Sequence, residues 1–482
     1  MHRLLAEVRD KTLKKRYRAR NGLEHGRYSL RVKVLGTAID ALSVPDGVAG
    51  RETVVTRAFL LPWAPRKGDL LTLDPDESAR ILRPRRAALH DGPSPGAGVS
   101  ADFVDSDRDG YPEDVVSNRF VRAVLQPHRG ARLSSLTGPD GEDRFAHPYE
   151  YIMAGKYVLL GGVEPVIAEA GSPGEIWKSA FERTVADGSA DAFEATYTRK
   201  LESPRGVVLT KTTRIEDDFP GVLETYRVKY SGKPGGPGGG RPPGGGGGSD
   251  ARDDARGRRG DGKKDETEVT FGLRASTATP GETPSLNVFE LSCADGVRTV
   301  RFHPPGFGRR WRWRDWRDEH FCLRGGFLVS RNERLGNVLA VLVNGRRAHY
   351  VSVRSDYTGP EVAVVHGTRK LAKGRSVTLG AAFLAGDAVA VGRGSMFLAS
   401  LGARRGGKRP LALTLRTTAD VGGSVRARVS SPEGARTVAL RRRSLPEVGD
   451  VHTGILELGG ESLPVSAGVG AGRERLSVRL EG

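Results

Sequence analysis

The feature that most constrains the fold of this chain is a two-residue alternation of apolar and polar side chains. Residues 30–34 (LRVKV) and 226–230 (YRVKY) both place apolar groups at every second position. That period is the period of a β-strand with one buried face. Spacing typical of an amphipathic helix is almost absent elsewhere. The pattern therefore predicts an all-β protein.

Glycine and proline strengthen this prediction. The 482 residues include 65 Gly and 28 Pro, while hydrophobic residues make up only 37%. Gly and Pro favour tight turns, so their excess fits many short strands joined by short loops. The length also exceeds the roughly 100–200 residues of one typical domain, which predicts a multidomain protein.

Three units follow from the distribution of candidate strands. Residues 1–100 are predicted to hold a basic, helical lead-in at Val8–Arg20 and a small β unit. Residues 101–400 form the main β body, and residues 405–482 form a C-terminal β-sandwich. The candidate strands are Val54–Leu61, Leu70–Leu73, Phe120–Leu125, Tyr157–Leu160, Phe193–Tyr197, Val207–Ile215, Leu223–Tyr230, Glu268–Arg274, Val297–Phe302, Phe327–Ser330, Val338–Val343, His349–Val353, Val362–His366, Val377–Leu384, Leu411–Leu415, Val425–Val429, Thr437–Leu440, Ile455–Leu458 and Leu476–Leu480.

A Gly/Pro-rich insert interrupts the body at residues 231–265. Its sequence, SGKPGGPGGGRPPGGGGGSDARDDARGRRGDGKKD, has almost no apolar surface to bury and is predicted to be disordered. The strands on either side, ending at Tyr230 and starting near Glu268, are predicted to be consecutive. The insert would then replace a hairpin loop, because lengthening a surface loop adds little closure entropy.

The chain is basic, with 76 Lys and Arg against 58 Asp and Glu and a formal net charge of +18. Such a balance is compatible with nucleic acid, anionic lipid or acidic polysaccharide as a partner. The positive charge is spread along the chain, so we interpret it as solvated basic surface. The lead-in could contact phosphates without specificity, but no recognised nucleic-acid fold follows it.

Several classes of protein are not indicated. The two cysteines, Cys293 and Cys322, form neither a disulfide framework nor a metal-type pair, and we expect free buried thiols. The alternative is a disulfide between them, because they lie on neighbouring predicted strands. No run of 18 apolar residues predicts a membrane span. The first residues lack the apolar core of a secretory signal, which predicts a cytoplasmic chain as written, or an exported one if the start codon is misplaced. Phosphate-binding loops, zinc-protease motifs and nucleophile elbows are absent.

The strongest chemical motif is an acidic loop. Asp105, Asp107 and Asp109 alternate before Gly110, and carboxylates at alternate positions of a bent loop can converge on one cation. Ca²⁺ takes about six to eight oxygen ligands, which predicts a calcium site. Val116 occupies the position where an EF-hand requires Glu, so the loop is not a complete EF-hand. The full candidate ligand set is Asp105, Asp107, Asp109, Tyr111 through its carbonyl, Glu113 and Asp114. The alternative is a surface connection in which Asp side chains bond nearby backbone amides.

The residues that follow this loop carry a family resemblance. Asp105–Asp109, Asn118-Arg119, Pro127 and the Gly130–Leu133 turn resemble the opening of galactose-mutarotase-like β-supersandwich domains, like those appended to family 57 glycoside hydrolases. The resemblance would cover residues 101–400. It implies a very large two-sheet sandwich, with carbohydrate or polysaccharide as the ligand class and a glycan-processing enzyme as a possible partner. Fold alone does not fix function.

An aromatic and basic stretch offers candidate sugar contacts. Residues 309–317 read RRWRWRDWR, and in a strand Trp311 and Trp313 would share one face while Arg310 and Arg312 share the other. Indole faces can stack on sugar rings or bases, and Arg can bind hydroxyls, carboxylates or phosphates. The alternative is a core strand with buried indoles and a solvated arginine face.

Catalytic candidates are weaker. His147 lies in a His-Pro-Tyr-Glu run, and an acid/base pair at a sugar carbon would combine it with Glu150 or Glu164. In the family that the chain resembles, the catalytic histidine comes later in the fold, so we assign His147 a non-catalytic role.

The leading hypothesis is therefore a carbohydrate-binding, non-catalytic accessory protein of glycan processing. The first alternative is an aldose epimerase or a polysaccharide lyase or hydrolase. The second alternative is nucleic-acid association through the basic lead-in and the Arg/Trp stretch, whose binding would weaken steeply with salt.

Overall fold

The computed structural model describes residues 5–7, 26–34, 53–61, 70–73, 79–84, 98–106, 110–145, 149–153, 158–159, 162–168, 176, 179–202, 204–232, 265–276, 287–293, 295–301, 317–321, 323–332, 336–348, 350–356, 359–419, 421, 424–459 and 463–480. The elements formed by these residues are all strands. The prediction of an all-β chain is therefore confirmed. In the ranges given, no helix is long and apolar enough to cross a membrane.

Two small sheets contain the N-terminal strands. A five-stranded sheet has the order β1-β4-β5-β10-β11, and a separate hairpin pairs β2 with β3. The strands are β1 (Leu5–Glu7), β2 (Gly26–Val34), β3 (Thr53–Leu61), β4 (Leu70–Leu73), β5 (Ala79–Pro84), β10 (Tyr149–Met153) and β11 (Val158–Leu159). Strands β10 and β11 come from the segment that the sequence pattern placed in the body, yet β10 pairs with β5. The lead-in helix predicted at Val8–Arg20 lies outside the described residues.

The first body sheet has nine strands in the order β20-β23-β24-β17-β12-β9-β8-β7-β6. Every adjacent pair in it is antiparallel. Its strands are β6 (Ser100–Val104), β7 (Glu113–Ser117), β8 (Arg122–Gln126), β9 (Arg132–Thr137), β12 (Gly162–Ala168), β17 (Glu266–Ser276), β20 (Arg317–Phe321), β23 (Tyr350–Asp356) and β24 (Gly359–Ala372).

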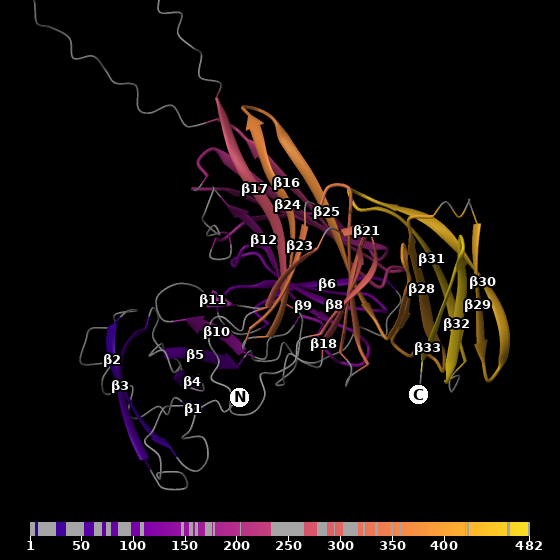
Figure 1. Ribbon diagram of the computed structural model, residues 1–482, viewed down its shortest axis with the longest axis horizontal. Helices are drawn as coiled ribbons and strands as arrows, with labels where there is room; N and C mark the ends of the chain where they lie inside the picture. The colour runs from indigo at the N-terminus through magenta and orange to yellow at the C-terminus, as the bar shows by residue number, and fades with distance from the viewer. Residues whose placement is uncertain are drawn as a thin grey trace, which may run out of the picture.

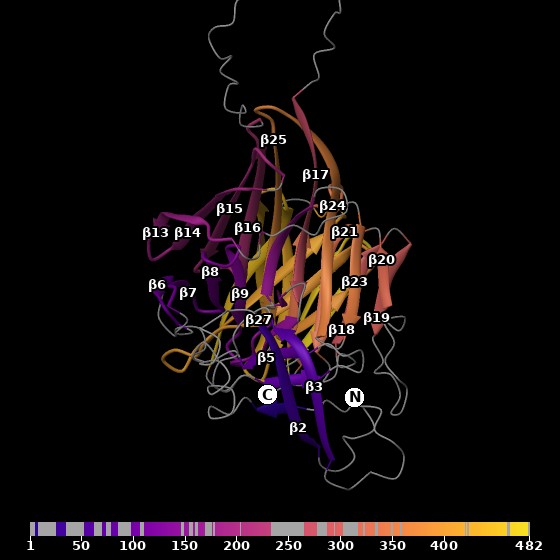
Figure 2. The same cartoon turned by 90° about the vertical axis from the view of Figure 1, so that its left-hand side faces the viewer.

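The second body sheet also has nine strands, in the order β13-β14-β15-β16-β25-β22-β21-β18-β19. Its strands are β13 (Glu182–Gly188), β14 (Ala192–Lys200), β15 (Val207–Glu216), β16 (Gly221–Tyr230), β18 (Asn287–Cys293), β19 (Gly296–Arg301), β21 (Leu323–Asn332), β22 (Val338–Val343) and β25 (Ser376–Gly386). Figure 2 shows the two sheets of the body, with β13 and β14 near β6 and β7 at one edge.

One apolar core lies between the two body sheets. Tyr226, Val228 and Tyr230 of β16 are fully buried, while Arg227 and Lys229 are exposed, as the alternating pattern predicts. The core cluster joins side chains from both sheets, among them Phe271 of β17 and Phe383 of β25. Each such side chain stabilises the fold by about 1.5–3 kcal/mol when it leaves water. The predicted large two-sheet sandwich is therefore present.

The strands on either side of the Gly/Pro-rich insert do not form a hairpin. Strand β16 pairs with β15 and β25 in the second sheet, whereas β17 pairs with β12 and β24 in the first. The prediction that the insert replaces a hairpin loop is wrong. The two strands nevertheless meet at one end of the sandwich, where the Tyr230 hydroxyl donates to Asp265 Oδ1 at 2.6 Å.

The C-terminal sheet has eight strands in the order β26-β27-β28-β31-β30-β29-β32-β33. It has its own apolar core, and it curls so that β26 and β27 contact β33. Figure 1 shows it in yellow beside the body. Its first strand lies ahead of residue 405, where we expected the unit to begin. The strands are β26 (Ala388–Val391), β27 (Ser395–Leu401), β28 (Arg409–Thr417), β29 (Ser424–Ser431), β30 (Gly434–Leu445), β31 (Gly449–Leu458), β32 (Val465–Ala471) and β33 (Glu474–Leu480).

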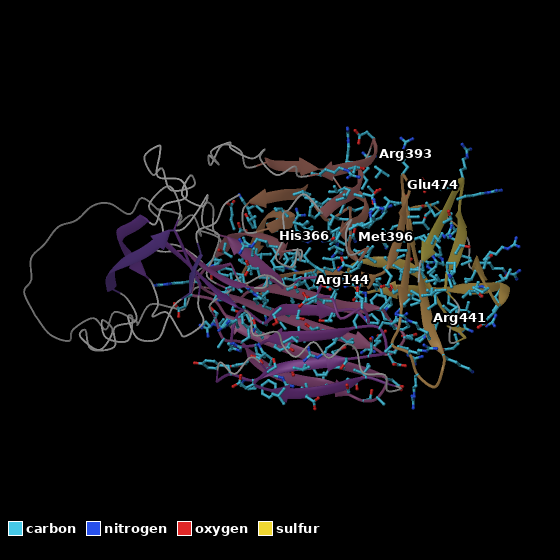
Figure 3. All side chains as sticks on the ribbon, turned by 90° about the horizontal axis from the view of Figure 1, so that it is seen from below. Arg144, His366, Arg393, Met396, Arg441 and Glu474 are labelled. Atoms are coloured by element: carbon cyan, nitrogen blue, oxygen red, sulfur yellow. The ribbon has the colours of Figure 1, made fainter. Side chains whose placement is uncertain are left out.

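The C-terminal sheet covers the outward face of the second body sheet. Phe327, Val338 and Leu384 on that face are fully buried against Met396 and Leu398 of β27. Figure 3 labels Met396 at this junction. Because apolar side chains fill the contact, no ligand can reach this part of the sheet, and a binding site must lie at its rim or on another surface.

Candidate functional site

The acidic loop between β6 and β7 is closed by hydrogen bonds to its own carboxylates. Asp105 Oδ2 accepts the backbone N–H of Gly110 at 3.0 Å. Glu113 Oε2 accepts both the backbone N–H and the hydroxyl of Ser106, at 2.7 and 2.8 Å. These are the local bonds of the alternative interpretation. Asp107 and Asp109 lie outside the described residues.

Asp114, another predicted calcium ligand, instead faces the interior of the sandwich. Its carboxylate accepts Arg183 Nε at 2.8 Å and the Tyr197 hydroxyl at 2.7 Å. The guanidinium of Arg183 also packs 4.1 Å from the ring centre of exposed Phe103. Burial and the neighbouring Asp114 raise the pKa of Tyr197 well above its usual 10.0. These contacts join the two body sheets at the edge that Figure 2 shows.

The calcium site therefore stays a prediction, and Asp105, Asp107, Asp109 and Glu113 are its candidate carboxylates. Among the residues whose positions are known, no three His, Cys, Asp or Glu side chains converge as metal ligands. Tyr111, whose carbonyl was a further candidate ligand, stacks its ring on His128 with the ring centres 4.9 Å apart.

The Asn118-Arg119 pair connects three parts of the molecule. Asn118 Oδ1 accepts the N–H groups of Phe120 and Val121 at 2.8 Å. Its Nδ2 donates to two carbonyls of the β15–β16 turn at 2.7 and 2.8 Å. Arg119 pairs with Asp217 in that turn, and its carbonyl accepts the N–H of Ala403 at 2.7 Å. The motif that carries the family resemblance thus has a structural role.

The catalytic candidates do not form a site among the described residues. His147 lies outside them, and Glu150 belongs to β10 in the N-terminal sheet, opposite Arg83. Glu164 of β12 is buried between Arg132 and Arg274. Burial opposes its charge, but the two guanidinium groups outweigh burial and hold the pKa of Glu164 below its usual 4.5. It stays ionised and engaged, which does not suit a general acid.

The candidate sugar contacts Trp311, Trp313, Arg310 and Arg312 also lie outside the described residues. Their role as ligand-binding residues remains a prediction.

A buried ion pair inside the sandwich was missed from the sequence. Lys211 of β15 and Glu224 of β16 are fully buried, with Lys211 Nζ 2.5 Å from Glu224 Oε1. Lys211 also reaches across the core to donate to the carbonyl of Ala131 at 2.6 Å, and the Tyr226 hydroxyl donates to Glu224. Burial lowers the pKa of Lys211 below its usual 10.5, against the opposing effect of Glu224. Because the pair is enclosed, we interpret it as structural.

The candidate site is a pocket of about 400 Å³ at the rim of the junction between body and C-terminal sheet. The ends of β18 and β21 supply one wall. Turns at the ends of β26, β28 and β33 supply the other. Its lining consists of Ser292, Cys293, Arg324, Gly325, Arg393, Gly394, Ser395, Thr418, Ala419, Ala471, Arg473 and Glu474. Residues separated by almost 200 positions in the sequence thus meet in one cavity.

Positive charge dominates this pocket. Arg324, Arg393 and Arg473 are exposed, and within the described part of the chain none of them forms an ion pair. The single carboxylate, Glu474, accepts the backbone N–H of Arg393 at 2.6 Å. Ser292, which is 1% exposed, donates its hydroxyl to the carbonyl of Arg393 at 2.9 Å and fixes the same turn. Figure 3 shows Arg393 and Glu474 side by side.

The pocket can bind a polar ligand through the guanidinium groups of its three arginines. Guanidinium groups present several N–H donors in a rigid plane and match hydroxyl and carboxylate oxygens. Cys293, which is buried, also lines the cavity. Cys322 lies outside the described residues, so the expectation of free thiols stays a prediction.

Neither protein-family models nor curated protein sequences match this chain. Several solved structures are similar at low sequence identity. A galactose mutarotase-like protein from Clostridium acetobutylicum is 8% identical, with a TM-score of 0.39 over 61% of this chain and 99% of that one. A putative aldose 1-epimerase from Klebsiella pneumoniae is 9% identical, with a TM-score of 0.39 over 75% of this chain and 87% of that one. A TPR-domain protein from Parabacteroides distasonis is 11% identical, with a TM-score of 0.38 over 75% of this chain.

The chain spans 55% of the length of the TPR-domain protein. All three TM-scores lie below 0.5, so these similarities assign neither a family nor an activity. The two-sheet sandwich follows from the strand pairing of this chain itself.

Proposed function

We propose that the protein binds carbohydrate without transforming it, as an accessory of a glycan-processing enzyme, and that the pocket at the body–C-terminal junction receives the sugar. The observation that carries the proposal is the pocket itself, with three arginines around a buried wall. Its volume falls within the roughly 300–1,000 Å³ of small-ligand sites. Sugar hydroxyls can accept hydrogen bonds from guanidinium groups. They can also donate hydrogen bonds to Ser and Thr hydroxyls or accept hydrogen bonds from them.

The composition of the pocket supports binding rather than catalysis. Acid–base chemistry at a sugar carbon needs two titratable groups with separated pKa values. Among the described residues that line the cavity, Glu474 is the one carboxylate, and it is held by a backbone N–H. Hydrogen-bond donors without an acid–base pair suit recognition. The glycan-processing partner, of the kind suggested by the resemblance to enzyme-appended domains, is part of the same proposal.

The test is a glycan-binding screen followed by calorimetry on the tightest ligand. The variant Arg324→Gln, Arg473→Gln removes two donors from the pocket, and we expect binding to weaken by at least tenfold. The control variant Arg346→Gln, Arg375→Gln makes the same change in net charge at two exposed arginines of the body, and we expect it to bind as the wild type does.

Two results would contradict the proposal. One is no binding to any neutral or acidic glycan at millimolar concentration. The other is mutarotation or cleavage of a bound sugar by the wild-type protein that is lost in His147→Ala, which would replace binding by the enzymatic alternative.

A further inference from the structure

Four adjacent strands of the C-terminal sheet are strongly and asymmetrically charged. In the order β30-β29-β32-β33 they contain eight arginines and a single carboxylate, Glu474. That carboxylate sits at the end of β33 and binds the backbone of Arg393 at the pocket. Arg436, Arg442 and Arg443 of β30 pair with acidic side chains that lie outside the four strands. The positive charge that matters here is therefore that of the other arginines.

Strand alternation sorts the arginines onto the solvent side. Val425, Ala427 and Val429 of β29 point into the core of the sheet, so Arg426 and Arg428 point outward. By the same alternation Arg441 of β30 and Arg475 and Arg479 of β33 are exposed. We call these five residues, Arg426, Arg428, Arg441, Arg475 and Arg479, the arginine face. Figure 3 shows long side chains with nitrogen ends projecting from the outer side of this sheet, where Arg441 is labelled.

The arginine face lies on both sides of β32, a strand whose outward residues are small. Strand β32 lies between β29 and β33 and turns only Ser466, Gly468 and Gly470 outward. Arg428 pairs with Gly468 on one side, and Arg475 pairs with Gly470 on the other. A Cβ atom added at Gly470 would meet nothing within 4 Å. Long cationic side chains therefore flank a strip that an extended ligand can approach.

The spacing of the charges suits a polymer. Arg426 and Arg428 lie two residues apart on one strand, or about 6.5 Å, and Arg475 and Arg479 lie four apart, or about 13 Å. Arg426, Arg428, Arg441 and Arg475 form no ion pair within the described chain. By contrast Arg442 and Arg436, on the same strand as Arg441, pair with Asp450 and Glu433. Like charges gathered without counter-charges raise the local potential and attract anions.

We propose that the arginine face binds an acidic polysaccharide, a chain with repeated sulfate or carboxylate groups. Charge complementarity selects a polyanion. The four strands contain no aromatic residue, so they lack the stacking platform of single-strand nucleic-acid binding. A broad sheet face also offers no narrow element to enter a DNA groove. No large apolar side chain is exposed on these strands, so nothing would insert into a lipid surface.

The test uses dextran sulfate as the probe and neutral dextran as its uncharged counterpart, titrated into the full chain across a salt series. The face variant carries Arg426→Gln, Arg428→Gln, Arg475→Gln and Arg479→Gln. The matched control carries Arg205→Gln, Arg346→Gln, Arg369→Gln and Arg375→Gln, four exposed arginines of the body, so that both variants lose the same net charge. Thermal unfolding verifies that each variant is folded.

We expect dextran sulfate to bind with an affinity that falls steeply as salt rises, and neutral dextran not to bind. The face variant should lose at least tenfold in affinity and show a shallower salt dependence, because ionic contacts set that slope. The control should change by less than twofold. Equal losses in both variants would show attraction by net charge alone and overturn the proposal. Tighter binding of duplex or single-stranded DNA, or of anionic vesicles, at the same salt would also overturn it.

The two proposed sites can fail separately. The face variant keeps Arg324, Arg393 and Arg473, so it should retain the pocket ligand, and the pocket variant should retain dextran sulfate. Failure of sugar binding at the pocket would not contradict the proposal for the arginine face. Failure of dextran sulfate binding at the arginine face would not contradict the proposal for the pocket.

Discussion

His366 gives the sharpest prediction about stability, because its environment opposes protonation. It lies on β24, faces the body core and is 2% exposed. Its Nδ1 lies 3.3 Å from the carbonyl of Arg347, which places the proton of the neutral ring on Nδ1. Its Nε2 is buried with no hydrogen-bond partner in the structure described above. Burial is the main cause that lowers the pKa of His366, and the positive charges of Arg369 and Arg347 act in the same direction. The pKa falls from 6.5 to about 4.

The sign follows from proton linkage. Between pH 6.5 and pH 4 the unfolded chain binds a proton at His366 and the folded chain does not, so acid favours unfolding. The stability that the neutral ring contributes is complete above pH 6.5 and is lost as the pH falls to about 4. A difference of 2.5 units between 6.5 and 4 amounts to about 3 kcal/mol, of which about 2 kcal/mol is lost by pH 5.

The assay compares urea unfolding of wild type and His366→Phe from pH 7.5 to pH 4, followed by tryptophan fluorescence. We expect the free energy of unfolding of His366→Phe to fall about 2 kcal/mol less than that of wild type between pH 7.5 and pH 5. The control is Val364→Ala, which weakens the same strand without removing a titrating group. Parallel pH profiles for wild type and His366→Phe would refute the argument.

Three further predictions concern single groups. Asn118→Ala removes four buried hydrogen bonds, so we expect the free energy of unfolding in urea to fall by about 2–4 kcal/mol. A fall below about 0.5 kcal/mol would contradict the structural role of Asn118. Lys211→Met leaves Glu224 buried and unpaired and should cost about 3–5 kcal/mol. Adding Glu224→Gln should recover part of that loss, whereas strict additivity in the double-mutant cycle would argue against the pair. Calcium at 100 times its dissociation constant adds about 2.7 kcal/mol, so it should raise the thermal midpoint of wild type but not of Asp105→Asn, Asp107→Asn, Asp109→Asn. Equal midpoints with calcium and with a chelator would exclude the site.

Local pattern was sufficient to locate many strands. Strands β4 and β22 occupy Leu70–Leu73 and Val338–Val343, the ranges predicted from alternation and flanking turn residues. Such signals are local, because a strand that buries one face must repeat its apolar side chains every second residue. The same logic placed Tyr226, Val228 and Tyr230 on one buried face.

Strand partners could not be predicted in this way. Strands β16 and β17 follow one another across the insert but pair in opposite sheets. Likewise β10 joins β5, more than sixty residues earlier. An alternating pattern specifies which side chains are buried and does not specify which strand lies alongside. That choice depends on packing between segments far apart in the chain.

The candidate site also combines features that a local sequence pattern can predict with features that depend on segments far apart in the chain. The pocket brings together residues from Ser292 to Glu474, and no local motif announces it. Lys211, by contrast, could have been noticed, because it occupies an inward position of an alternating strand between Leu209 and Thr213. A charged residue on a predicted core face indicates a buried partner.

The position of the C-terminal sheet explains why both proposed binding surfaces involve it. Its β27 strand covers the outward face of the second body sheet, which removes that broad surface from any ligand. The same packing brings the β26–β27 and β32–β33 turns against β18 and β21, and the gap between them is the arginine-lined pocket. The strands β29, β30 and β33 carry the arginine face on the solvent side. Docking of this sheet therefore closes one surface and creates another, so a variant that weakens the apolar contact at Leu398 should impair the pocket while leaving the arginine face intact.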